Sequence, residues 1–264
     1  MCGIAGYSAR RSSRIGRTFC AQVLLAAIAE RGADAVGYAH RDGSAGSATV
    51  FKQRSGASAL LDQVHVPEEA TQVLLHVRDY TKGHPRIEAN NHPVRHGAVV
   101  GVHNGIIFND DDLMARYSFM REEPGMTVDT EAIFALAEAR DNDPQSFQEL
   151  RGSMAAAWFD ERRPELVYLA RGVGRPLWIG QGPDETLFAS TEAALEVAER
   201  YCGLRLAKAE LPEGTLVALA DGRELRRDDF APDRSFEEQS LPAVRAPREG
   251  DLCLRRLDAL AGLI

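Results

Sequence analysis

The first fifty residues alternate between apolar runs and polar breaks, and the run lengths predict a strand, a helix and a strand pair. Residues 2–6, CGIAG, are small or apolar and indicate the start of a buried strand. Residues 17–30 form a longer apolar-rich stretch that is typical of a helix. Residues 35–53 predict two strands, because their turn is rich in Asp-Gly and Ser-Gly.

The middle of the chain contains the most apolar strands and the clearest helix. Residues 71–78 and 97–108 predict two buried strands, the second of which we expect to end at an Asn-Gly pair. Helices are predicted for residues 110–117 and 127–141. In the second helix the apolar positions that recur at helical spacing are Ile133, Phe134, Leu136 and Ala137.

Strand patterns return in the following segment of the chain. The predicted strands are residues 152–160, 165–172, 176–180 and 186–190, followed by a helix at 191–200 and a hairpin at 204–222. Strands thus dominate both ends of the chain with helices between them, and no regular strand–helix–strand alternation is visible. The order favours an α+β fold over a doubly wound parallel sheet.

The composition changes near Asp221, where a charged stretch interrupted by prolines predicts a linker or an extended arm. The last residues, 251–264, regain an apolar stripe at helical spacing. Its members are Leu254, Leu257, Ala261 and Ile264. So short a helix needs a packing surface, so it either folds back on its own domain or docks on another protein or a second copy of this chain. The second alternative leaves a homo-oligomer open.

Composition and charge exclude several classes of protein. The 264 residues, 44% hydrophobic and 27% charged, suffice for one large domain or two small ones. A net charge of −8 argues against nucleic acid or an anionic membrane as the partner. No apolar run could cross a bilayer and no signal-peptide pattern is present, so we expect a cytoplasmic protein. The four cysteines include no C-x-x-C pair, which argues against disulfides and a zinc site.

Cys2 differs from the other cysteines because it directly follows the initiator methionine. Once Met1 is removed, Cys2 carries both a nucleophilic sulfur and a basic α-amino group. A free thiol has a pKa near ~8.5 and an α-amine one near ~7.7–8.0, so the amine can accept the thiol proton without a catalytic histidine. The alternative is a cysteine buried for packing, as we expect for the other cysteines.

Five stretches of sequence must be considered together. They are CGIAG at 2–6, RGADAVG at 31–37, HVRDYTKG at 76–83, NNHP with VHNGII within 90–107, and VDTEAI at 128–133. In order and spacing they resemble the glutaminase domain of the class II glutamine amidotransferases, which are N-terminal nucleophile hydrolases. The resemblance implies a four-layer αββα sandwich of two antiparallel sheets over residues 1–220, followed by an arm and a short amphipathic helix at 221–264. It also implies that glutamine is cut to glutamate and ammonia, with no cofactor.

The resemblance assigns catalytic roles to Asn104 and Gly105 beside Cys2. A thiolate that attacks an amide carbon creates an oxyanion, which needs hydrogen-bond donors already in place. The side-chain amide of Asn104 and the backbone N–H of Gly105 are the expected donors. Glycine also suits a site where the backbone approaches a substrate closely. The alternative is an ordinary Asn-Gly hairpin turn.

The resemblance assigns recognition of the glutamine head group to Arg78 and Asp129. A guanidinium can bind a carboxylate through two parallel hydrogen bonds, and a carboxylate can bind an ammonium group. Arg78 ends an apolar strand, so the alternative for it is a solvated strand end. Asp129 directly precedes a predicted helix, so the alternative for it is a helix N-cap.

Two further residues, Thr81 and His92, are placed at the substrate by the resemblance. We interpret His92 as a hydrogen-bonding support of the site rather than a base. His76, His96 and His103 have no spacing that suggests a metal site. The family typically reads Arg-Trp-Ala-Thr-His-Gly where residues 78–83 of this chain read Arg-Asp-Tyr-Thr-Lys-Gly.

Three functions remain open at this point. The sequence contains neither a G-x-x-x-x-G-K loop nor an S-G-G-x-D-S loop to activate an ammonia acceptor, and residues 221–264 are too few for a synthase domain. We therefore expect a glutaminase that supplies ammonia to a synthase on a separate chain. The alternatives are an N-terminal nucleophile hydrolase that cuts a γ-glutamyl or other amide without ammonia transfer, and a catalytically silent binding or regulatory module.

Overall fold

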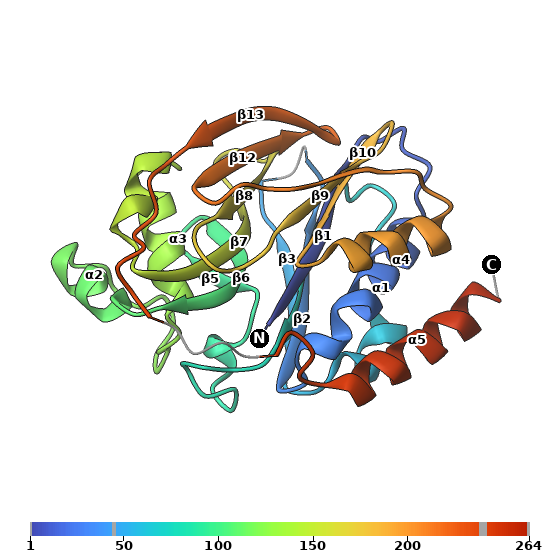
Figure 1. Ribbon diagram of the computed structural model, residues 1–264, viewed down its shortest axis with the longest axis horizontal. Helices are drawn as coiled ribbons and strands as arrows, with labels where there is room; N and C mark the ends of the chain where they lie inside the picture. The colour runs from blue at the N-terminus through green and yellow to red at the C-terminus, as the bar shows by residue number, and fades with distance from the viewer. Residues whose placement is uncertain (1, 44–45, 238–241, 263–264) are drawn as a thin grey trace.

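Two antiparallel β-sheets form the centre of the molecule in the computed structural model, which describes residues 2–43, 46–237 and 242–262 (Figure 1). Within these residues the first sheet has seven strands, in the order β11 (Ala207–Glu210), β9 (Trp178–Gln181), β10 (Glu185–Ala189), β1 (Gly3–Ala9), β4 (Gln72–Arg78), β2 (Ala35–Arg41) and β3 (Thr49–Gln53). The second has six, in the order β13 (Arg223–Asp229), β12 (Thr215–Ala220), β8 (Leu166–Arg171), β7 (Gly152–Asp160), β6 (Val99–Ile107) and β5 (Val94–His96).

Helices cover the outer face of each sheet, as Figure 1 shows on its two sides. The first sheet is covered by α1 (Arg17–Ile28) and α4 (Glu192–Cys202), with α5 (Pro247–Ala261) packed against α1. The second is covered by α3 (Thr130–Ala139), with α2 (Asp110–Arg116) packed against it. The short 3₁₀ helices are η1 (Ala29–Arg31), η2 (Ala57–Ala59), η3 (Leu61–Gln63), η4 (Glu88–Asn90) and η5 (Pro144–Glu149). The four-layer αββα sandwich predicted from the sequence is confirmed.

The layers follow from the alternation of side chains along each strand, which sends successive residues to opposite faces. In β4 the side chains of Val73, Leu75 and Val77 join the core beneath α1 and α4. Leu74 joins the core between the two sheets, and His76 bonds to the neighbouring sheet from the same face of β4. A buried polar residue between two sheets requires a hydrogen-bond partner, and for His76 this partner is the backbone carbonyl group of His103 in β6.

The C-terminal region differs from the sequence prediction at one element. Residues 223–229, expected to be part of an extended arm, form β13 and pair with β12 at the edge of the second sheet. The charged residues of this strand are compatible with a sheet edge because their side chains are nearly all exposed. The hydrophobic alternation that identifies a buried strand is therefore absent from its sequence.

The predicted C-terminal helix is present as α5, and it folds back on its own chain against α1 and η1. Its buried face consists of Gly250, Cys253 and Leu257, whereas Leu254 is 37% exposed. The predicted stripe was thus wrong at Leu254, and Ile264 lies outside the described residues. The Glu249 carboxylate accepts hydrogen bonds from the backbone N–H and the hydroxyl of Ser58, which fastens the first turn of α5 to η2.

Candidate active site

Cys2 lies immediately before β1 and its side chain is half-buried. The Arg31 side chain donates from Nε to the Cys2 carbonyl oxygen at 2.9 Å. Gly32 passes so close to the next strand that a Cβ atom would lie 2.4 Å from the Arg78 carbonyl oxygen. The RGADAVG stretch therefore has a structural role, because it holds the start of β1 beside the end of β4.

Burial raises the pKa of the Cys2 thiol, and the Arg78 guanidinium opposes this rise. The thiol is within 3.5 Å of the Asp79 carbonyl oxygen, to which it can donate. A thiol with a raised pKa is protonated at neutral pH, so a base must remove its proton before the sulfur can attack.

A small cavity brings together most of the residues that the motifs predict. Its free volume is about 10 Å³, roughly that of one water-sized sphere. The residues that line it are Cys2, Arg78, Tyr80, Thr81, Lys82, His92, His103, Gly105, Val128, Asp129 and Thr130. Binding of any larger molecule there requires the surrounding side chains to move.

Arg78 is the last residue of β4 and is only 2% exposed, so it is not a solvated strand end. Its guanidinium donates to Asn91 Oδ1 at 2.7 Å, to the Lys82 carbonyl oxygen at 2.8 Å and to the Gly83 carbonyl oxygen. These are neutral acceptors. A bound carboxylate could displace the two carbonyl groups and would make stronger, charge-assisted hydrogen bonds with the guanidinium.

Asp129 is buried at the start of α3, where its side chain makes no capping bond to the helix. Its Oδ2 atom instead accepts a hydrogen bond from the backbone N–H of Ile107 at 2.7 Å. Burial raises the pKa of Asp129 to about 6, and the nearby Asp110 acts in the same direction, while the Ile107 N–H opposes it. The carboxylate is therefore available to bind a cation rather than occupied as an N-cap.

The Asn-Gly pair does not form the hairpin turn that its sequence allows. Strand β6 continues to Ile107, and Gly105 lies opposite Met154 of β7. Gly105 has φ +146°, and a Cβ atom at this position would lie 2.0 Å from the Ser153 carbonyl oxygen, so only glycine fits. The prediction that the strand ends at this pair was wrong, because pairing with β7 extends through it.

Asn104 does not line the cavity, although its neighbour Gly105 does. It is only 1% exposed. Among the described residues neither its Nδ2 nor its Oδ1 atom has a hydrogen-bond partner. Buried amides are almost always bonded, so an unbonded donor next to the cavity is a candidate for contact with a substrate atom.

Two buried histidines, His92 and His103, line the cavity, and with Thr130 they form what we name its floor. The rings of His76 and His92 stack with centroids 4.1 Å apart. His92 Nε2 and His103 Nδ1 lie 2.9 and 3.0 Å from the Thr130 hydroxyl oxygen. Burial lowers the pKa of His76 to about 3, that of His103 to about 4 and that of His92 well below its ordinary value. The floor is therefore uncharged at neutral pH.

Ion pairs hold residues 79–83, which we name the cover segment and of which Tyr80, Thr81 and Lys82 line the cavity. Lys82 Nζ lies 2.7 Å from Asp110 Oδ1 and 2.8 Å from Asp111 Oδ2. Asp79 Oδ2 lies 3.0 Å from Arg245 Nε, just before α5. Both ion-paired residues of the segment, Asp79 and Lys82, stand where the family pattern has a different residue type.

Six of the residues predicted from the motifs meet at the cavity, namely Cys2, Arg78, Thr81, His92, Gly105 and Asp129. The motifs predicted no role for His103, Thr130 or Lys82, although each stands within one of them. Their hydrogen bonds join segments that lie far apart in the sequence, which a linear pattern does not contain. Within the described ranges no group of three His, Cys, Asp or Glu side chains could hold a metal ion.

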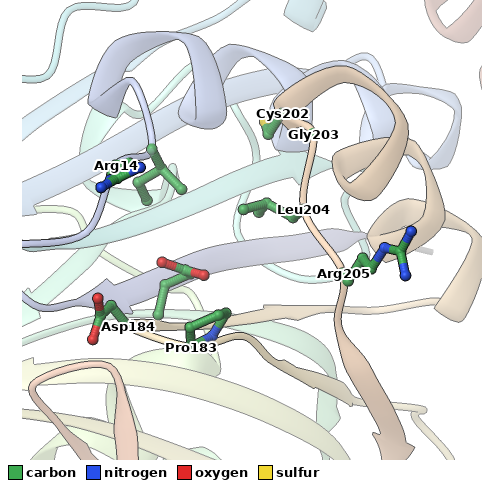
Figure 2. Close-up of a pocket in the computed structure, with 9 residues that line it drawn as sticks. Arg14, Pro183, Asp184, Cys202, Gly203, Leu204 and Arg205 are labelled. Carbon is green, nitrogen blue, oxygen red and sulfur yellow. The ribbon is translucent and has the colours of Figure 1, made fainter.

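A wider pocket of about 620 Å³ lies elsewhere, beside the end of α4 (Figure 2). The side chains labelled there include Arg14, Asp184, Cys202 and Arg205. None of the motif residues lines this pocket. The motif residues therefore gather at the smaller cavity beside Cys2. In the described part of the chain no helix is long and apolar enough to cross a membrane.

Sequence comparison relates the chain to one family. Residues 82–197 match the family described as "Glutamine amidotransferase domain". The chain is 32% identical over 260 residues to a glutamine–fructose-6-phosphate aminotransferase [isomerizing] of Shigella flexneri, covering 90% of this chain and 40% of that protein. The protein of the same name from Bacillus licheniformis is 31% identical over 219 residues, 77% of this chain and 34% of its own length. The chain thus spans less than half the length of these relatives.

Comparison of structures gives the same fold. A glutamine phosphoribosylpyrophosphate amidotransferase from B. subtilis, solved with ADP and GMP, superposes with a TM-score of 0.66 at 20% identity. The match covers 86% of this chain and 49% of that one. A structure described as the allosteric regulatory enzyme of purine biosynthesis matches with the same TM-score at 21% identity.

Proposed function

The chain belongs to the class II, N-terminal nucleophile glutamine amidotransferases, and on this premise we propose that Cys2 hydrolyses the side-chain amide of glutamine. The observation that carries the proposal is a buried arginine and a buried aspartate, Arg78 and Asp129, in one cavity with the Cys2 thiol. A guanidinium and a carboxylate held apart by the fold match the two charges of an amino-acid head group.

On substrate binding, hydrogen bonds between Arg78 and backbone carbonyl groups are replaced by charge-assisted hydrogen bonds to glutamine. The α-carboxylate of glutamine displaces the Lys82 and Gly83 carbonyl groups from Arg78, and the α-ammonium group binds the free lone pairs of Asp129. Because the cavity holds only about 10 Å³ without substrate, the cover segment moves outward on entry. Thr81, which lines the cavity from this segment, reaches the substrate from the same side.

The chemical step begins after Met1 is removed. The α-amino group of Cys2 accepts the thiol proton, and the sulfur attacks the side-chain amide carbon. The resulting oxyanion accepts hydrogen bonds from the Asn104 Nδ2 group and the Gly105 backbone N–H. The carbon–nitrogen bond then breaks, the amine returns its proton to the departing ammonia, and a glutamyl thioester remains on Cys2. Water hydrolyses this thioester to glutamate.

The released ammonia goes, in this proposal, to an acceptor-activating synthase on a separate chain. The relatives are more than twice as long as the matched region, and their names describe transfer of an amino group to a sugar phosphate. The alternative is an amide hydrolase that releases ammonia without transfer, since a γ-glutamyl substrate presents the same head group. A cytosolic location agrees with a nucleophile that must stay reduced.

Blocking the N-terminus tests the mechanism. A variant with an uncleavable N-terminal extension ahead of Cys2 should release no glutamate from glutamine, as should Cys2→Ala, while both keep the melting temperature of the processed protein. Cys20→Ala changes a buried cysteine in α1 and is the matched control that keeps activity. Hydrolysis at the normal rate by the extended protein would remove the α-amine from the mechanism.

Substrate range and partner are tested separately. Ammonia and glutamate release should be measured from glutamine, from γ-glutamyl amides and from asparagine. Turnover of glutamine alone, with a co-purifying chain that increases the rate, supports ammonia transfer. Faster turnover of a γ-glutamyl amide without any partner would favour the alternative function, and no turnover at all would indicate a binding module.

A further inference from the structure

Two consecutive residues at the start of α3 are bonded to the same strand on either side of the Asn104–Gly105 pair. Asp129 Oδ2 accepts from the backbone N–H of Ile107 at 2.7 Å. The hydroxyl of Thr130 lies 3.0 Å from the side chain of His103. His103 directly precedes the pair on β6 and Ile107 follows it two residues later, so the expected oxyanion donors lie between two anchors.

The direction of every hydrogen bond in this network can be deduced. His103 Nε2 lies 3.3 Å from the Ser153 carbonyl oxygen, which can only accept, so Nε2 carries the proton. Because the ring is neutral, its Nδ1 atom is an acceptor, and the Thr130 hydroxyl donates to it. The single hydroxyl proton is then used, so Thr130 accepts from His92 Nε2, 2.9 Å away.

A hydroxyl is therefore required at position 130. Thr130 is 1% exposed, and both histidines are nearly as buried. Replacement of the hydroxyl by a methyl group would leave one buried donor, on His92, and one buried acceptor, on His103, without partners. Each unsatisfied buried group is costly, so the two imidazole rings would turn to find new partners. Because His103 directly precedes Asn104 in β6, movement of His103 would displace Asn104 as well.

We propose that Thr130 is a positioning residue for the hydrolysis: its hydroxyl, bonded to His92 and His103, fixes the Asn104–Gly105 donors relative to Asp129 and the substrate. The inference rests on the proposed function. Substrate binding depends on the Asp129–Ile107 anchor, which does not involve the Thr130 side chain. Loss of the hydroxyl therefore acts on the chemical step more than on binding.

Thr130→Val and Thr130→Ser separate this role from simple packing. Valine keeps the shape of the side chain and removes the hydroxyl, whereas serine keeps the hydroxyl. We expect Thr130→Val to lower kcat for glutamine on the order of 100-fold, the effect of a misplaced catalytic group, with a smaller change in KM. Thr130→Ser should restore kcat. A lower melting temperature with unchanged kcat in Thr130→Val would overturn the proposal.

Nitrogen-15 NMR of labelled histidines tests the hydrogen-bond directions without activity. In the unmodified protein His92 and His103 should both carry the proton on Nε2, and in Thr130→Val their signals should shift while those of His40, which packs on Tyr38 and Phe51 in the first sheet, stay. A proton on Nδ1 of either ring in the unmodified protein would overturn the proposal even if the valine variant does not fold. If the unmodified protein does not hydrolyse glutamine, the proposed function fails instead, and the NMR result still decides whether Thr130 bridges the two rings.

Discussion

The floor of the cavity and the cover segment are held by different kinds of interaction. The floor consists of His92, His103 and the Thr130 hydroxyl, which are buried and joined by hydrogen bonds of fixed direction. The cover segment is held by ion pairs to Asp110, Asp111 and Arg245, several of which are partly exposed. Neutral buried hydrogen bonds resist salt, whereas exposed ion pairs weaken in it.

The difference suits two separate roles, the positioning of groups in the floor and the entry of substrate past the cover segment. The floor lies next to the expected oxyanion donors, where small displacements are expensive. The cover segment must move for a substrate to enter, and partly exposed ion pairs can break and re-form at low cost. In this chain the residues that depart from the family pattern, Asp79, Tyr80 and Lys82, all lie in the cover segment.

The largest effect is expected where the two regions meet, at Arg78. Arg78→Lys removes the paired geometry that a carboxylate needs, and loss of such a contact costs on the order of 2–5 kcal/mol. We therefore expect KM for glutamine to rise about 100-fold, with a smaller change in kcat. Arg17→Lys alters another buried arginine, in α1, and serves as control. An unchanged KM in Arg78→Lys would remove this residue from substrate binding.

The charge of Asp129 makes both the stability of the protein and its binding of glutamine depend on pH. An unfolded aspartate ionises near 3.8, whereas burial raises the pKa of Asp129 to about 6. Between pH 3.8 and pH 6 the folded protein therefore keeps the Asp129 carboxyl protonated while the unfolded chain has lost this proton. Above pH 6 the carboxylate is charged and buried in the folded state, which lowers the free energy of unfolding. Asp129→Asn can still accept from the Ile107 N–H, so we expect it to increase the free energy of unfolding at pH 8 by on the order of 1–3 kcal/mol.

The increase in the free energy of unfolding of Asp129→Asn should vanish as the pH falls toward 4. Urea unfolding of both proteins at several pH values measures this increase. The same variant should lose glutamine binding, and KM of the unmodified protein should rise as the pH falls below about 6, since only the carboxylate binds an ammonium group. A stability gain that does not depend on pH would mean that the Asp129 carboxylate is not charged in the folded protein.

The smallest effect is expected in the cover segment. Lys82→Met leaves the buried Asp110 with Arg121 at 3.7 Å as its nearest cation, and should lower the free energy of opening by about 1 kcal/mol. Hydrogen exchange of residues 79–85 should become several times faster, and 1 M salt should have a similar effect on the unmodified protein. Lys208→Met removes a distant ion pair to Glu199 and is the matched control. Unchanged exchange in Lys82→Met would show that the ion pairs do not hold the segment.

The sequence predicted one residue on each side of the cavity, His92 in the floor and Thr81 in the cover segment, and assigned no role to His103, Thr130 or Lys82. The helices and the buried strands were visible as apolar periodicity, and the segments that line the cavity as motifs. The pairing of Lys82 with Asp110 was not, because it joins residues 28 positions apart that only the fold brings together. Strand β13 was missed because an edge strand with exposed charged residues has no apolar alternation. The Asn-Gly pair was misassigned because tertiary pairing with β7 overrides the local turn preference.

The central claim is that the Cys2 sulfur forms a covalent bond with the glutamyl group. Processed protein mixed with glutamine, stopped in acid within the first turnovers and digested, should yield an N-terminal peptide that carries one glutamyl group on Cys2, detected by mass spectrometry. The adduct should be absent in Cys2→Ala and should disappear as the glutamine is exhausted. Steady release of glutamate with no adduct at Cys2 under these conditions, or an adduct at another residue, would contradict the account.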